Sequence, residues 1–263
     1  LKLNEMTELN GQVVECTFYA TAFNVSDLAL STLDRYIGIV QSDSVKEKVL
    51  LLRAYLAAGE TDKFEAGKKQ LPLCVAGGAM EGGRKLEHLI RYSQCCIADL
   101  DDVPGNVEEV VRKAETLPYV KAGHISPSGT GIKLFVLVDS PLPRHREAFE
   151  CISRRIEQDL PGVTVDPSGK DANRGCFFSY DPTAFYKEWA EVLHVPVLQT
   201  ASAHAPQPSG NALANYIDKF EQGNPFVGGN RHSFVVKLAS ALNSAGFDEH
   251  EVCYECLRRY TEP

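Results

Sequence analysis

The feature that most constrains this chain is an apolar run that ends in closely spaced carboxylates, at residues 95–102 (CCIADLDD). A short apolar run followed by turn residues, here Pro104-Gly105, predicts a buried strand. Side chains alternate between the faces of a strand, so Asp99 and Asp101 should point the same way. Neighbouring carboxylates repel each other unless a cation lies between them, and Mg²⁺ binds such oxygens together with water and substrate phosphates. The motif therefore predicts either a metal-dependent phosphoryl or nucleotidyl transfer site or a solvated acidic turn.

A second acidic strand end follows later in the chain. Residues 163–165 are expected to form a short strand that ends at Asp166, and Asp171 comes soon after it. Either residue could complete a three-carboxylate site, and we favour Asp166 because it directly ends an apolar strand. As an alternative, Asp166-Pro167 is a common turn dipeptide. Arg174 has the planar guanidinium that can grip a phosphate through two hydrogen bonds.

Between these acidic strand ends lies a turn rich in glycine and hydroxyl side chains, residues 126–133 (SPSGTGIK). Gly129 and Gly131 allow backbone amides to turn toward an anion, and Ser128 and Lys133 add a donor and a positive charge. The spacing matches neither a P-loop nor a dinucleotide-binding pattern. Taken alone, the stretch is best explained as a tight β-hairpin.

Length, charge and cysteine content narrow the class of protein. A chain of 263 residues, 44% hydrophobic and 24% charged, suggests a soluble protein with one medium domain and a small one. Eight irregularly spaced cysteines suit a reduced cytoplasmic protein better than a disulfide scaffold. The net charge of -8 argues against a high-affinity, non-specific nucleic-acid binder, although an enzyme can still hold nucleic acid in a local basic groove.

The order of helical and strand patterns predicts an α+β sandwich, with helices on one face of a mainly antiparallel sheet. Helices are expected over residues 27–36, 44–58, 61–69, 107–116 and 143–158, and strands over 12–19, 69–76, 119–126, 134–138 and 175–180. The glycine-rich stretch 77–83 is expected to be a flexible loop. It is either a simple hairpin loop or, with Arg84 and Lys85 at its end, a cover for a bound triphosphate.

Composition divides the chain into three parts. Residues 1–198 are expected to form the main domain, which begins with a helical part that extends to about residue 68. Residues 199–210 are predicted to be a linker, and residues 211–263 are predicted to form a small all-α domain. Arg231 opens a helix in that domain and is either a nucleic-acid contact or a helix-start residue.

Together these motifs resemble the archaeo-eukaryotic primase superfamily, in its primase-polymerase branch. The chain is most similar to the domain that precedes virulence-E-type helicases in bacterial mobile elements. The family's first motif is a strand ending in acidic-x-acidic, here Asp99-Leu100-Asp101, and its third is a strand-terminal Asp, matched by Asp166. Its second motif corresponds to residues 126–133, in the family's Ser-Gly-x-Gly-x-Lys form. The resemblance covers most of residues 45–190, and the tail resembles the small helical domain that commonly follows the primase core.

The resemblance implies an RRM-like primase-polymerase core and template-dependent nucleotidyl transfer. Asp99, Asp101 and Asp166 would be the catalytic carboxylates and would hold two Mg²⁺ or Mn²⁺ ions. The nucleoside triphosphate would be bound by Ser126, Ser128, Gly129, Gly131, Lys133 and Arg174. Two other functions share parts of the pattern, namely a non-catalytic replication module that binds single-stranded nucleic acid and a metal-dependent nuclease.

One position departs from the family's pattern. Many members carry a His in the second motif where this chain has Lys133. A lysine holds phosphate well but transfers protons poorly near neutral pH. His124 lies two residues before Ser126 on the same strand face, and it either contributes to the site or is structural.

The expected partners follow from the implied reaction. They are single-stranded DNA or a primer–template, nucleoside triphosphates, and a helicase domain. Because the chain carries no Walker-type motif, the helicase would lie in a C-terminal part outside this sequence or on a separate chain. The protein is expected to be cytoplasmic and bacterial, with no membrane association.

Overall fold

The computed structural model describes residues 12–101, 103–196 and 210–224, together with Phe234, Val235, Lys237, Leu238, Ala241, Leu242, Ala245, Phe247 and Arg259. The chain divides into two compact units, Leu1–Pro196 and Val197–Pro263. Within these described residues, no helix is both long and apolar enough to cross a membrane.

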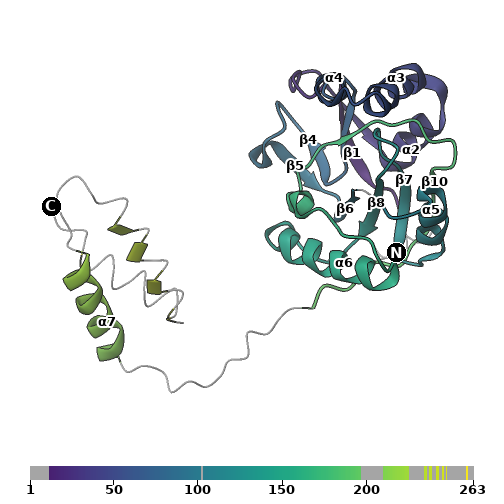
Figure 1. Ribbon diagram of the computed structural model, residues 1–263. Coiled ribbons are helices and arrows are strands. Elements are labelled where there is room, and N and C mark those ends of the chain that lie inside the picture. The colour runs from purple at the N-terminus through teal and green to yellow at the C-terminus, as the bar shows by residue number, and fades with distance from the viewer. Residues whose placement is uncertain are drawn as a thin grey trace, which may run out of the picture. The chain divides into compact units, whose positions relative to one another are not determined.

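The first unit alternates helices with short strands (Figure 1). In chain order they are β1 (Glu15–Tyr19), β2 (Leu28–Thr32), α2 (Leu33–Gln41), α3 (Lys46–Ala57), α4 (Thr61–Lys68), β3 (Leu73–Val75), β4 (Gly78–Met80), β5 (Leu89–Tyr92), β6 (Cys95–Leu100), α5 (Val107–Thr116), β7 (Val120–Ile125), β8 (Ile132–Leu137), α6 (His145–Asp159), β9 (Cys176–Phe177) and β10 (Phe185–Tyr186). Short 3-10 turns lie at η1 (Asp43–Val45), η2 (Leu86–His88), η3 (Leu142–Arg144) and η4 (Pro167–Lys170).

All pairings between these named strands are antiparallel. They form a sheet of order β2-β1-β3-β9, a second sheet of order β10-β7-β8-β6, and a two-stranded sheet of β4 and β5. The prediction of an α+β protein with a mainly antiparallel sheet and several helices is therefore confirmed.

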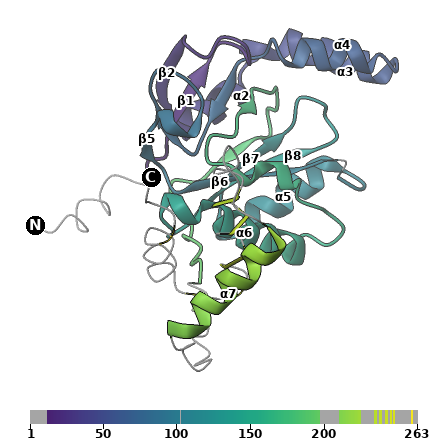
Figure 2. The ribbon, with the colours of Figure 1, turned by 90° about the vertical axis from the view of Figure 1, so that its left-hand side faces the viewer.

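The sheet β10-β7-β8-β6 is buried on both faces, and β6 shows how. Cys96, Ala98 and Leu100 pack in the core that includes α5 and α6, while Cys95 and Ile97 pack in the core that includes α2 and the first sheet. Figures 1 and 2 show α5 and α6 beside this sheet, with the first sheet and α2–α4 on its other side. We call the face turned toward α2 and the first sheet the inner face. Alternation along β6 places Asp99 on that face.

The chain order around this sheet is β6-α5-β7-β8-α6, followed by a single antiparallel bridge between Val165 and Leu100 of β6. The bridge adds Val165 beside β6, so the spatial order becomes Val165-β6-β8-β7-β10. It also brings the residue after Val165, Asp166, to the end of β6.

The prediction of a helix over Asp27–Tyr36 is wrong for the first half of that range. Leu28–Thr32 form β2, which pairs with β1 from Glu15↔Thr32 to Tyr19↔Leu28, and α2 begins only at Leu33. Leu28 and Leu30 fit a strand period as well as a helical one, and pairing with β1 decides between them.

The prediction of a flexible loop over residues 77–83 is also wrong for the first half of that range. Gly78–Met80 form β4, whose three residues are all buried. A Cβ on Gly77 would collide with the carbonyl oxygen of Ala172, and a Cβ on Gly78 with that of Arg91. These glycines therefore allow two backbones to approach closely and do not provide mobility.

The second unit contains α7 (Gly210–Gly223). Leu213 and Ile217 of this helix pack with Phe234, Leu238 and Leu242. The predicted linker over residues 199–210 lies outside the described residues except for Gly210, and Arg231 lies outside them too.

Replacing Gly77 by Ala should destabilise the first unit by about 1–3 kcal/mol, because the added methyl group overlaps a buried carbonyl. Gly38 is the matched control, since it lies on the exposed side of α2 with nothing near its added Cβ. Gly38→Ala should stabilise the helix by about 0.5–1 kcal/mol. Urea denaturation of both variants measures the two effects. A Gly77→Ala protein as stable as the wild type would show that this stretch is indeed loose.

His145, the first residue of α6, gives the fold a dependence on pH. It is 5% exposed, and its Nδ1 lies 2.7 Å from the Tyr92 hydroxyl. Burial lowers the pKa of His145 to about 4, against the opposing effect of Asp171. An unfolded histidine titrates near pH 6.5, so between pH 6.5 and 4 the unfolded chain binds more protons. The free energy of unfolding should therefore fall as the pH is lowered from 6.5 to 4, because protonation of His145 favours the unfolded chain.

Replacing His145 by Gln should remove this part of the acid sensitivity. Between pH 6.5 and 4 the wild type should lose about 3 kcal/mol more of its unfolding free energy than His145→Gln does. Urea denaturation at several pH values measures both slopes, so a lower absolute stability of the variant does not affect the comparison. Parallel slopes would contradict the argument.

Candidate active site

Three side chains form a row across the inner face of the sheet β10-β7-β8-β6. Asp99 of β6 pairs directly with Lys133 of β8, and Lys133 pairs with His124 of β7. Directly paired residues of antiparallel strands share one face of the sheet. The strand register therefore places a carboxylate, an ammonium and an imidazole side by side.

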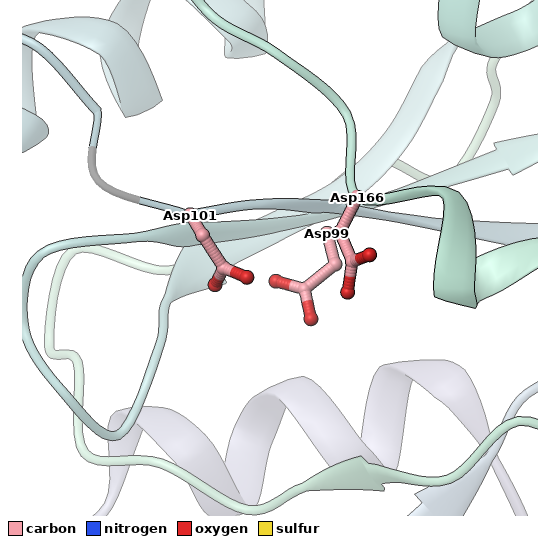
Figure 3. A group of neighbouring side chains, drawn as sticks. All are labelled: Asp99, Asp101 and Asp166. Atoms are coloured by element: carbon pink, nitrogen blue, oxygen red, sulfur yellow. The ribbon is translucent and has the colours of Figure 1, made fainter.

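The other two predicted carboxylates join this row at its Asp99 end. The Val165 bridge brings Asp166 alongside, and the Asp166 amide donates to the Asp99 carbonyl oxygen at 2.7 Å. Asp101 follows the end of β6, two residues after Asp99. One carboxylate oxygen from each of the three lies within 4.8 Å of those of the other two. Figure 3 shows all three side chains on the same side of the backbone strands that carry them.

Asp99 has one satisfied and one unsatisfied oxygen. Its Oδ2 is ion-paired with the Lys133 ammonium, and its side chain is 14% exposed. Its Oδ1 is buried and receives no hydrogen bond from any described residue. A buried carboxylate oxygen without a partner is costly. A hard divalent cation would satisfy this oxygen, and three clustered carboxylates are a suitable donor set for one.

Asp166 is held in place by its own turn. The Ser168 amide donates to Oδ1 at 2.9 Å, and the Ser168 hydroxyl donates to Oδ2. Burial alone would raise the pKa of Asp166, but the Ser168 hydrogen bonds and the charges of Arg174 and Lys133 outweigh it and lower the pKa. The side chain is therefore an oriented carboxylate at neutral pH.

Lys133 is mostly charged at neutral pH, despite its burial. Its side chain is only 13% exposed. Burial lowers the pKa of Lys133 to about 8, helped by Lys68 and Arg174 and opposed by Cys176 and Asp166. A positive charge thus lies between the carboxylate cluster and the rest of the sheet.

A cavity of about 750 Å³ adjoins the cluster and includes Asp99, Asp101 and Lys133 in its wall. Its volume is within the range of small-molecule sites. Six of its lining residues are basic, namely Lys68, Lys69, Arg84, Lys85, Lys133 and Arg174. The combination of clustered carboxylates and converging cations suits a ligand that carries both metal and phosphate.

Four of the six residues predicted to bind nucleotide line this cavity: Ser126, Ser128, Lys133 and Arg174. Gly129 and Gly131 are not part of its wall. The Gly129 amide donates to the Ser126 carbonyl oxygen at 3.0 Å, which closes the turn, and its φ of 83° is one that glycine adopts easily. A Cβ on Gly131 would lie 2.6 Å from the Leu100 carbonyl oxygen. The glycines thus let the hairpin close on itself and lie against the end of β6.

Arg53 of α3 supports the hairpin from outside and was not predicted from the sequence. Its guanidinium donates to the carbonyl oxygens of Ser126 at 3.2 Å, Pro127 at 3.4 Å and Tyr180 at 3.1 Å. It therefore fixes the start of the turn that carries the serines. A polar residue on a helix carries no local signal for such a contact, since its partners are 73 to 127 residues away.

Sequence reasoning also did not assign Lys68 and Lys69, at the end of α4, to the site. Basic residues at a helix end usually need no other explanation than the helix dipole. Asp171, the alternative third carboxylate, lines the cavity but is outside the three-carboxylate cluster. It is largely exposed and lies 4.0 Å from Arg146.

His124 is fully buried and does not line the cavity. Its Nδ1 lies 2.9 Å from the Ile125 carbonyl oxygen and its Nε2 lies 2.9 Å from the Tyr36 hydroxyl. Burial lowers the pKa of His124, so the ring is neutral at pH 7. These contacts favour a structural role over a share in proton transfer.

Comparison with known proteins gives one match. The model of the BT4734-like, N-terminal domain family matches residues 66–186, somewhat under half of the 263 residues. The chain is thus similar to that family over the segment that carries the three carboxylates and the hairpin. No curated protein and no solved structure matches the chain.

The Asp99–Lys133 pair should show strong coupling in a double-mutant cycle. Asp99→Asn leaves a buried ammonium unpaired and Lys133→Gln leaves a buried carboxylate unpaired, so the double variant should lose less stability than the sum. We expect a coupling of about 1–3 kcal/mol in urea denaturation at pH 7 with EDTA.

The exposed Arg91–Glu15 pair, at 2.7 Å, is the matched control for that cycle. Its coupling should stay below about 1 kcal/mol because solvent screens it. Additive losses at Asp99 and Lys133 would show that the two charges do not depend on each other.

Proposed function

We propose that this protein is a metal-dependent nucleotidyltransferase of the primase-polymerase type, which joins nucleotides on a nucleic-acid template. The observation that carries the proposal is the cluster of Asp99, Asp101 and Asp166 beside a cavity with six basic lining residues. Phosphoryl transfer needs carboxylates for divalent cations and cations for the phosphates, and this site brings both together.

The three carboxylates would hold Mg²⁺ or Mn²⁺, in two positions according to the resemblance. The unsatisfied Oδ1 of Asp99 supports this choice, because it is a buried oxygen that lacks a donor in the described part of the chain. When bound, such ions lower the pKa of an attacking hydroxyl and neutralise charge on the transferred phosphate. Ser168 keeps Asp166 oriented for this role.

Lys133, Arg174, Ser126 and Ser128 would bind the triphosphate of the incoming nucleotide. Lys133 supplies a fixed charge next to the carboxylates, and Arg174 is close enough to lower the pKa of Asp166. Their positive charges would favour the negative charge that develops on the departing pyrophosphate. Arg53 would keep the serine turn in position.

The topology supports the same proposal. Strand–helix–strand–strand–helix–strand, ending in the Val165 bridge, is the order of ferredoxin-like sheets, to which RRM-like sheets also belong. Asp99 lies on β6, a central strand of that order, and Asp166 follows Val165 at the edge of the sheet beside β6. A single-stranded template, a primer end and an associated helicase are the partners that such an activity requires.

Two alternatives use parts of this site. A metal-dependent nuclease would need the carboxylates, and a non-catalytic replication module would need only the basic surface. The cavity favours the transferase, because six basic lining residues suit a triphosphate better than a single scissile diester.

Changing any one of Asp99, Asp101 and Asp166 to Asn should lower nucleotide incorporation by about 100-fold or more. Labelled ribo- and deoxynucleoside triphosphates on a single-stranded template, with and without primer and with Mg²⁺ or Mn²⁺, provide the measurement. Asp171→Asn should cost less than about 10-fold, since Asp171 is outside the cluster. Asp62→Asn, on the exposed first turn of α4, should change nothing.

Thermal unfolding with and without Mn²⁺ serves as the control for folding. The wild type should be stabilised by Mn²⁺, and the Asp99→Asn/Asp101→Asn double variant should fold without that gain. Full incorporation by this double variant would refute the proposed site. Cleavage of single strands without incorporation would point to the nuclease, and tight strand binding without either would point to the binding module.

A further inference from the structure

Part of the cavity wall is apolar and comes from a segment with no assigned role. Ala22, Phe23 and Val25, in the connection between β1 and β2, line the cavity together with Phe177 of β9. Phe23 is 67% exposed, the largest value among the large hydrophobic side chains that the structure describes. A single exposed aromatic residue is ordinary, but one in the wall of a basic cavity is placed to meet a ligand.

The backbone that carries Phe23 is fixed by hydrogen bonds. The Thr21 hydroxyl accepts from the amides of Phe23 at 3.3 Å and Asn24 at 3.1 Å. The Ala22 amide donates to the Lys69 carbonyl oxygen at 3.2 Å, which ties the connection to the end of α4. Phe23 is therefore held next to the basic residues of the cavity and keeps its ring exposed.

The two kinds of wall define the chemistry of the ligand. Basic side chains at Lys68, Arg84 and Arg174 suit phosphates, whereas the flat face of an aromatic ring suits a planar heterocycle. Lys68 connects the two, because its ammonium lies 6.0 Å from the centroid of the Phe177 ring. A nucleotide has both of these parts, a polyphosphate and a planar heterocycle.

We propose that Phe23 forms a nucleobase subsite, against which the base of the bound nucleoside triphosphate stacks. This inference rests on the proposed function, and it adds a residue from the N-terminal hairpin, outside the family match at residues 66–186. Stacking on an aromatic ring tolerates any base, so the subsite should accept all four nucleotides, with a modest preference for the larger purines. Phe23 contributes binding of the base and takes no part in phosphate binding.

The test compares ATP with inorganic tripolyphosphate, which has the phosphates but no base. Calorimetric titration uses Ca²⁺ in place of Mg²⁺ to suppress turnover. Phe23→Ala should weaken ATP binding by about 10-fold or more and change tripolyphosphate binding by less than about 2-fold. Phe23→Tyr should retain ATP binding. Leu30→Ala is the matched control, since Leu30 is a 54% exposed residue of the same hairpin that does not line the cavity.

A spectroscopic probe gives a second readout. The sequence contains a single tryptophan, Trp189, which is 49% exposed. In a Trp189→Phe background, Phe23→Trp places the sole indole in the subsite. ATP should quench its fluorescence and tripolyphosphate should not.

The outcomes separate this inference from the function on which it rests. If Phe23→Ala leaves ATP binding intact while Arg174→Gln weakens it, the base subsite is refuted and the phosphate site stands. If Phe23→Ala weakens ATP and tripolyphosphate equally, Phe23 acts on the phosphate site and the inference is also refuted. If the wild type binds neither compound, the proposed function and the base subsite both fail.

Discussion

The structure around the site depends on the register between β6 and β8, which sets Asp99 against Lys133 on the inner face of a sheet that is buried on both sides. A shift by one residue would leave the two charges on opposite faces of the sheet, with one of them in the core formed with α5 and α6. The ion pair is therefore tied to the packing of the whole first unit. Lys133 pairs only with Oδ2, so the second oxygen of Asp99 remains without a donor among the described residues. A bound cation would satisfy this buried oxygen.

Close backbone approaches bring the remaining parts of the site to that pair. Gly131 lets the serine hairpin lie against the end of β6, and Gly77 lets β4 lie against the segment that carries Arg174. Arg53 then holds the hairpin from α3. Each contact joins segments that are distant in sequence, so the cavity has a wall from the N-terminal hairpin, α4, the β4–β5 connection and the sheet itself. The local basic cavity within a chain of net charge -8 shows why total charge is a weak guide to the ligand of a local site.

The proposed functions of the parts are mutually consistent. The clustered carboxylates suit divalent cations, the basic residues suit a polyphosphate, and the exposed ring of Phe23 suits a base. The resemblance to primase-polymerases would place a histidine where this chain has Lys133, and His124 makes a buried contact with Tyr36 instead. Proton transfer in the proposed reaction therefore has no histidine at this position, and Lys133 serves there as a fixed charge.

The sequence by itself determined the α+β class, the carboxylates Asp99 and Asp101 at the end of β6 and the hairpin at residues 126–133, because these follow from alternation and from turn chemistry within a few residues. It also favoured Asp166 over Asp171, and the structure places Asp166 with Asp99 and Asp101. Tertiary structure alone decided that Leu28–Thr32 pair as a strand, that Gly77 is buried, and that Lys68, Arg53 and Phe23 face or support one cavity. The physical reason is that these outcomes depend on pairing and close packing between segments far apart in the chain, which no local pattern of residues records.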